Sequence, residues 1–190
     1  MLARIVTLTA LAVGGALLAK QMKKSGAAGN ESSVKESIEV NAPLRSVYDQ
    51  WTQFEEFPQF MNSVREIKQL DDKRLHWKAE VFGKEIEWDA EITEQIPDQK
   101  IAWRSTSGTP NAGVVTFQSL SGERTQVTLV INYEPQDAVE TIGDALGAVR
   151  TEAKGNLQKF KEMMELRGGQ ETGAWRSTIA EGQPSADTQH

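Results

Sequence analysis

Apolar and polar residues alternate with a period of two through the middle of the chain, from Val64 to Tyr133. The clearest stretch spans residues 84–93, where every second position is apolar and acidic residues occupy most of the positions between. Turn-forming residues separate the alternating stretches at Gly83, Pro97-Asp98, 108–111 and Ser121-Gly122. This pattern predicts an antiparallel meander with one apolar face and one solvated face.

A strand and two short helices are expected before the meander. Residues 34–40 form the strand, and Asn41-Ala42-Pro43 supplies the start signal of a helix. That helix has apolar residues at positions i, i+3, i+4 and i+7, namely Leu44, Val47, Tyr48 and Trp51. A second short helix is expected over residues 54–61, although Pro58 interrupts or kinks it.

A helical period returns after Pro135 and continues to about Arg167, where Gly168-Gly169 stops the helix. Its apolar stripe comprises Val139, Ile142, Leu146, Val149, Ala153, Leu157, Phe160 and Met164. This helix is the only large amphipathic element available to cover the apolar face of the sheet. The prediction is an α+β helix-grip fold: an antiparallel β-sheet wrapped around a long C-terminal α-helix, with two short helices after the first strand.

The predicted domain covers residues 34–167. Residues 168–190 are polar, and we expect them to form a disordered tail.

The N-terminal run Ile5–Ala19 is uncharged and mostly apolar. As a helix it would rise roughly 22 Å, short of the ~30 Å hydrocarbon core, but residues 1–3 extend it and the flanking lysines can snorkel. We therefore predict a membrane anchor over residues 1–19 and a flexible linker over residues 20–33. A cleaved secretory signal is the alternative. The lysines that follow the run directly, and Leu17 where a small residue is needed, argue against it.

More Lys and Arg residues lie on the C-terminal side of this run than before it. The positive-inside rule then predicts a membrane-associated protein with a single N-terminal anchor and its domain in the cytoplasm.

Composition excludes several kinds of site. The 190 residues contain no cysteine, which excludes disulfides, zinc–thiolate sites, iron–sulfur clusters and thiol nucleophiles. Of the two histidines one is the terminal His190, so we expect no metal site and no cofactor. A net charge of −6 argues against nucleic acid as a partner.

An ordered series of sequence phrases resembles the START-like, Bet v 1-like superfamily of polyketide cyclases and dehydrases. The phrases are SIEVNAP (37–43), FEEFPQFM (54–61), LHWKAE (75–80), EIEWDAEI (85–92), KIAWRS (100–105), GVVTFQ (113–118) and TQVTLVINYEP (125–135). The chain looks most similar to bacterial membrane-associated cyclase/dehydrase-like proteins, and less so to coenzyme Q-binding START proteins. The resemblance implies an internal apolar cavity between sheet and helix, but no particular reaction.

The apolar faces supply candidate ligand-binding residues. They are Trp77, Trp88, Trp103, Phe117 and Tyr133 on the sheet, with Ile142, Gly143, Leu146 and Arg150 on the helix. A glycine inside a helix costs about 1 kcal/mol relative to alanine, so Gly143 and Gly147 need a reason. Either close packing of the helix on the sheet or space for a bound ligand would explain these glycines. A packed aromatic core without any ligand is the alternative to a cavity.

The strand phase places no carboxylate or lysine on the inward face, so polar contacts would come from indole N–H groups, Tyr133, Ser105 and Arg150. This favours an uncharged hydrophobic ligand with a hydroxyl or carbonyl group, such as a lipid, a quinone or a polyketide-like compound.

No catalytic residue can be assigned. His76, Arg104 and the acidic residues of 85–91 alternate outward, onto the solvated face. We predict a membrane-tethered module that binds a hydrophobic small molecule. A cyclase or dehydratase acting on a polyketide-like substrate, and a ligand-free interaction domain positioned at the membrane, are the alternatives.

Overall fold

The computed structural model describes residues 32–81, 83–120, 122–133 and 142–180, all within one compact unit. The predicted anchor over residues 1–19 lies outside the described residues. So does the predicted linker over 20–33, except for Ser32 and Ser33, which belong to the first strand.

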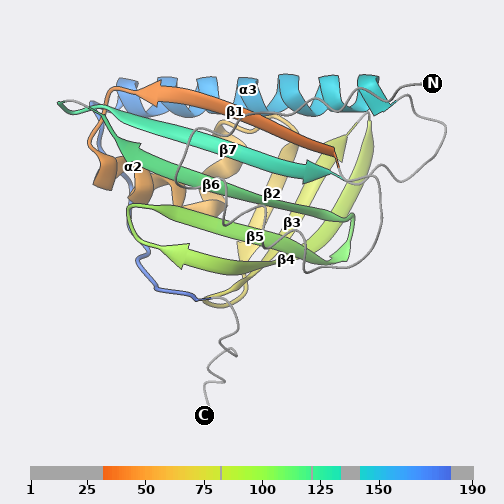
Figure 1. Cartoon of the computed structure of the whole chain (residues 1–190). Helices are drawn as coiled ribbons and strands as arrows, with labels where there is room; N and C mark the ends of the chain where they lie inside the picture. The colour runs from red at the N-terminus through yellow and green to blue at the C-terminus, as the bar shows by residue number, and fades with distance from the viewer. Residues whose placement is uncertain (1–31, 82, 121, 134–141, 181–190) are drawn as a thin grey trace, which may run out of the picture. The chain divides into compact units, whose positions relative to one another are not determined.

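Seven antiparallel strands form one curled sheet in the order β1-β7-β6-β5-β4-β3-β2 (Figure 1). The strands are β1 (Ser32–Val40), β2 (Val64–Gln69), β3 (Arg74–Val81), β4 (Lys84–Ile96), β5 (Lys100–Gly108), β6 (Asn111–Ser119) and β7 (Thr125–Tyr133). Strands β2 to β7 run in sequence as a meander, and β1 joins the sheet beside β7. The predicted meander is confirmed.

Three helical elements accompany the sheet: α2 (Leu44–Trp51), the 3-10 helix η1 (Phe54–Gln59) and α3 (Ile142–Leu166). The long helix α3 lies alongside β1, and the sheet curls away beneath it (Figure 1). This arrangement confirms the helix-grip fold. The predicted break at Pro58 takes the form of the tighter 3-10 turn.

The segment before α2 is tied to the far end of α3. Pro43 is the N-cap of α2, and its side chain makes no capping hydrogen bond. Asn41 instead donates from its backbone N (3.0 Å) and its Nδ2 (2.7 Å) to Oε1 of Glu165. These two bonds hold α2 against the last turns of α3.

The core divides into two parts. One part, the closed end, is filled by a cluster of edge-to-face and tilted aromatic rings, namely Tyr48, Trp51, Phe54, Phe57, Phe60, Phe117 and Phe160. The other part, the tryptophan end, contains the half-buried Trp77, Trp88 and Trp103 of the sheet, and we group with it the half-buried Leu146 and Val149 of α3. The tryptophan end is therefore the less completely covered part of the interior.

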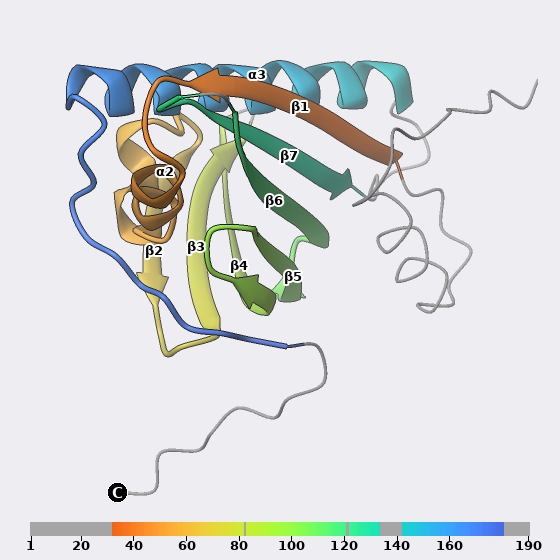
Figure 2. The ribbon, with the colours of Figure 1, turned by 60° about the vertical axis from the view of Figure 1, so that its left-hand side comes forward.

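Residues 168–180 pack against the domain, where we expected a disordered tail from residue 168 onward. After α3 the chain turns at Gly168 and Gly169, both with positive φ (64° and 77°), and descends past α2 toward β3 and β4 (Figure 2). Ile179, near its end, is only 4% exposed and pairs with Gln95 of β4. Residues 181–190 lie outside the described residues.

The predicted localisation, membrane-associated through an N-terminal anchor with a cytoplasmic domain, has to be corrected. Within the described ranges, no helix combines the length and the apolar character needed to cross a bilayer. The long α3 carries charged residues throughout, because one of its sides faces solvent.

Candidate functional site in the tryptophan end

Two indole rings are stacked in the tryptophan end. Trp77 of β3 and Trp88 of β4 are directly paired across the two antiparallel strands, so both side chains project from the same face of the sheet. Their ring centroids are 5.4 Å apart and their planes differ by 14°. The rings of Trp77 and Phe57 form an edge-to-face contact with their centroids 5.9 Å apart, which connects the stack to the closed end.

The indole nitrogen of Trp77 is a buried hydrogen-bond donor. Its Nε1 is buried and has no hydrogen-bond partner among the residues that the structure describes. A buried polar group left unpaired costs about 1–3 kcal/mol. A carbonyl or hydroxyl oxygen brought by a bound molecule would satisfy it.

Asn111 fixes the third tryptophan. The Nε1 of Trp103 donates to Oδ1 of Asn111 at 3.2 Å, and the backbone N of Asn111 donates to Oγ of Ser105 at 3.0 Å. The Trp103 ring lies directly over Gly113, where a Cβ atom would clash with it. The sequence offered no periodic signal for Asn111, because this residue lies at the first position of β6, next to a turn.

The helix side of the tryptophan end carries Leu146 and Val149, both half-buried and packed against the core. At Gly147 and Gly155 a Cβ atom would meet nothing within 4 Å. Close helix–sheet packing therefore does not explain these two glycines. Ile142 and Gly143 lie in the first turn of α3, but their surroundings lie outside the described residues.

A carboxylate does occur on the inward face of β1, contrary to the expectation from strand phase. Glu36 shares that face with the buried Val34 and Val40. Its Oε1 lies 3.4 Å from Nε of Arg150 on α3, and the Glu36 side chain is 22% exposed against 63% for Arg150. The predicted ligand residue Arg150 is therefore ion-paired at the edge of the sheet beside β1.

Two further predicted site residues lie on β6 and β7. Phe117 is buried in the closed end, where its ring packs at 5.3 Å from Tyr48 and 6.1 Å from Trp51. Tyr133 is the last residue of β7 and pairs with Asn111 in the sheet, but its side chain lies outside the description.

The solvated face of the sheet holds the histidine. His76 Nδ1 lies 2.7 Å from Oδ1 of Asp89, and Ser107 Oγ donates to Oδ2 of Asp89 at 2.9 Å. The hydrogen bonds with His76 and then Ser107 lower the pKa of Asp89 below its usual value. In this order the carboxylate lies between serine and histidine, so no histidine activates the serine as a nucleophile.

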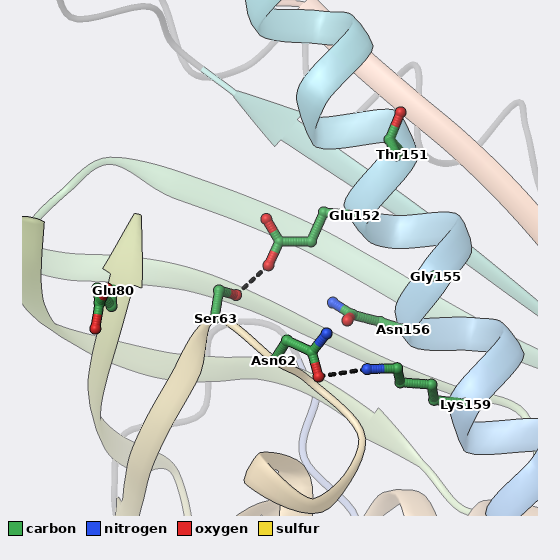
Figure 3. A pocket seen from close by; sticks show the side chains of 8 residues that line it. All are labelled: Asn62, Ser63, Glu80, Thr151, Glu152, Gly155, Asn156 and Lys159. Atoms are coloured by element: carbon green, nitrogen blue, oxygen red, sulfur yellow. Dashed lines mark hydrogen bonds between the residues drawn. The ribbon is translucent and has the colours of Figure 1, made fainter. Parts of the chain in front are cut away.

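A polar groove of about 400 Å³ runs between α3 and the segment joining η1 to β2 (Figure 3). Two contacts cross it: Ser63 Oγ donates to the Glu152 carboxylate, and Lys159 Nζ donates to Oδ1 of Asn62. Thr151, Gly155, Asn156 and Glu80 complete the lining. With this polar lining, the groove is not suited to an apolar ligand body.

Comparison with known proteins identifies the family. The family model for polyketide cyclase/dehydrase and lipid transport matches residues 40–162, which span β2 to β7 and most of α3. The chain belongs to this family.

One relative by sequence and two solved structures of similar fold can be compared with this chain. A 17.2 kDa protein from the melC2–rnhH intergenic region of Streptomyces lincolnensis, described as uncharacterised, is 49% identical over 149 residues, covering 78% of this chain and 99% of its own. The Zhui aromatase/cyclase of Streptomyces sp. R1128 has a TM-score of 0.63 at 17% identity, over 73% of this chain and 96% of its own. A START superfamily protein from Mycobacterium smegmatis has a TM-score of 0.58 at 17% identity, covering 71% and 95% respectively. At these identities the two structures are similar in fold alone.

Proposed function

We propose that this family member binds an uncharged hydrophobic small molecule in the tryptophan end of its interior. The observation that carries the proposal is the unpaired indole N–H of Trp77, buried beside the stacked ring of Trp88. Flat aromatic walls suit an apolar body, and a single buried donor suits one carbonyl or hydroxyl oxygen. A quinone, a polyketide-like phenol or a long-chain alcohol has this chemistry. The family description, which names cyclases and lipid transport together, supports the same class of ligand.

Binding is favoured over catalysis by the state of the polar side chains that were candidates for contact with a ligand. Arg150 is exposed and paired with Glu36, and Ser105 already accepts a hydrogen bond from Asn111. A cyclase needs an acid or a base within reach of the substrate carbonyl. Among the described side chains of the tryptophan end, the Trp77 N–H is a buried donor without a partner, and an indole donates a hydrogen bond but acts as neither an acid nor a base at ordinary pH.

The test is a calorimetric titration of the full chain with a decyl-substituted benzoquinone, together with mass analysis of whatever co-purifies. We expect the quinone to bind and Trp77→Phe to weaken its affinity about five- to tenfold, because phenylalanine keeps an aromatic ring but lacks the N–H donor. Trp88→Phe is the matched control, since it changes the same stack from the other side. It should alter the affinity by less than about twofold, because its own N–H is not the proposed donor.

Two results would count against the proposal. A chain that binds none of the quinone, phenol and alcohol probes, and that carries no apolar molecule from any expression host, does not have this function. Equal losses in Trp77→Phe and Trp88→Phe would show that the N–H donor plays no part.

A further inference from the structure

The C-terminal segment 168–180, here called the strap, follows a path of its own over the closed end. It leaves α3 and runs past α2 before it reaches β4 (Figure 2). The strap begins after residue 162, where the match to the family model ends. The family description therefore does not account for it.

Three buried polar side chains of the domain bind the main chain of the strap. Gln50 Oε1 accepts from the backbone N of Thr172 at 2.9 Å, and Thr52 Oγ1 accepts from the backbone N of Trp175 at 2.9 Å. Gln95 Nε2 donates to the carbonyl O of Trp175 at 3.0 Å. Gln50, Thr52 and Gln95 are each at most 1% exposed. The domain thus uses its own buried side chains to bind the extended backbone of the strap.

The C-terminal part of the strap pairs with strand β4 of the sheet. Ile179 and Gln95 exchange both backbone hydrogen bonds, at 2.9 and 3.0 Å, as a single antiparallel bridge. The Ile179 side chain is buried, and the ring of Trp175 meets the edge of Phe54 at 6.3 Å. Strand addition combined with pockets for single side chains is a common mode of peptide recognition.

Arg176 is the charged anchor of the strap. Its guanidinium donates to carboxylate oxygens of both Asp49 and Asp98, and it lies 5.3 Å over the ring centre of Tyr48. Asp49 is only 2% exposed, so this ion pair is well shielded from solvent on the domain side. A planar guanidinium presents five N–H donors in a rigid fork and a flat face that stacks on an aromatic ring, so it suits two carboxylates and a ring at once better than an ammonium group does.

The surface beneath the strap combines these buried polar side chains with core contacts to Trp175 and Ile179. If the strap leaves, the polar atoms of Asp49, Gln50, Thr52 and Gln95 gain water in place of their lost partners, which limits the cost of release. We propose that these residues and Asp98 form a peptide-binding site, here called the strap site, whose resident ligand is the strap. The site fits an extended segment with the pattern Trp-Arg-x-x-Ile, which residues 175–179 provide. This inference is independent of the hydrophobic ligand.

The test uses the full chain with a specific protease site inserted after Gln170, an exposed residue. After cleavage the fragment that contains residues 171–190 should stay with the folded domain on gel filtration, and a labelled synthetic copy should exchange into the site. Arg176→Ala in the synthetic copy should weaken its binding at least about tenfold, because a buried charge-assisted contact is lost. Arg176→Lys should give an intermediate affinity. Thr178→Ala, at an exposed position of the strap, is the matched control and should bind like the unaltered peptide.

Three outcomes would overturn the proposal. Unfolding of the domain on cleavage, followed by circular dichroism, would make the strap a part of the fold instead of a ligand. Immediate loss of the fragment, with no binding of the synthetic copy at millimolar concentration, would show that the strap site has no affinity of its own. Equal binding of the Arg176→Ala and Thr178→Ala peptides would remove Arg176 as the anchor.

Discussion

Trp77 and Trp88 lie face to face, with ring planes only 14° apart, although 10 residues and a turn separate them in the sequence. Their pairing in register across β3 and β4 brings the two rings together. Most of the other aromatic contacts in the described core are edge-to-face or tilted. The stack therefore gives the tryptophan end a flat wall that the closed end lacks.

The stack is expected to contribute measurably to stability even without a ligand. Trp88→Ala should lower the free energy of unfolding by about 1–3 kcal/mol, since it removes both half-buried area and the ring–ring contact. Trp88→Phe should recover most of this loss, because it retains an aromatic face. Urea unfolding followed by circular dichroism measures both variants. Equal losses for alanine and phenylalanine would contradict a stabilising stack.

Two glycines should respond in opposite directions to the same substitution. Gly113→Ala places a Cβ against the Trp103 ring and 2.6 Å from the carbonyl O of Val130, so it should destabilise the fold by about 1–3 kcal/mol. Gly147→Ala places a Cβ in open space on α3 and should stabilise it by about 0.5–1 kcal/mol. Thermal and urea unfolding of the two variants provide the comparison. A destabilised Gly147→Ala variant would mean that the helix needs the freedom of glycine at this position.

The Asp89 carboxylate should make stability depend on acidity. Because its bonds with His76 and Ser107 lower its pKa in the folded state, its contribution is present above the unfolded value of about 3.9 and is lost as pH falls through the folded pKa. Asp89→Asn should therefore be less stable than the natural chain at neutral pH. The difference in the free energy of unfolding between the two proteins should become smaller at about pH 3, as measured by urea unfolding. Glu85→Gln, at an exposed position of the same strand, is the control and should show a smaller gap at neutral pH. A pH-independent gap for Asp89→Asn would contradict the assignment.

The inward carboxylate of Glu36 should make the proposed site discriminate between neutral and anionic ligands. Dodecanol is expected to bind at least about tenfold more tightly than dodecanoate, because the carboxylate of the latter would be desolvated near another negative charge. Glu36→Gln should reduce the difference in affinity between dodecanol and dodecanoate. Calorimetric titration with the two ligands measures these affinities. Equal or tighter binding of dodecanoate would show that Arg150 is available to the ligand in spite of its ion pair with Glu36.

The periodicity of the chain predicted its elements well, because each strand and helix has one buried face over most of its length. The strand from residue 34, the meander over 64–133 and the long helix to about residue 167 all follow from that pattern. The alternation of apolar and polar residues predicts which face of the sheet a side chain occupies. It does not predict which end of the interior that side chain reaches. Phe117 shares the inward face with Trp103, yet it lies among Tyr48 and Trp51, in the closed end.

The periodicity of the sequence does not predict contacts between polar residues that are far apart in the chain. The pairing of Glu36 with Arg150 depends on α3 running alongside β1, which periodicity does not reveal. The strap was missed for a related reason. Its partners are polar side chains of α2, of β4 and of residues just after each, and its own anchors, Trp175, Arg176 and Ile179, have no repeating pattern.

The sheet has two edges, and the chain protects them by different means. Strand β1 lies alongside α3, whereas β2 lies against the short η1 and has no neighbouring strand on its outer side in the described sheet. Unpaired backbone groups of an edge strand can template association with another polypeptide. In β2 the ladder shifts register between Val64 and Glu66, and the charged Arg65 and Lys68 are exposed. A bulged edge with charged side chains opposes strand-to-strand aggregation, so the irregularity in β2 favours solubility at high concentration.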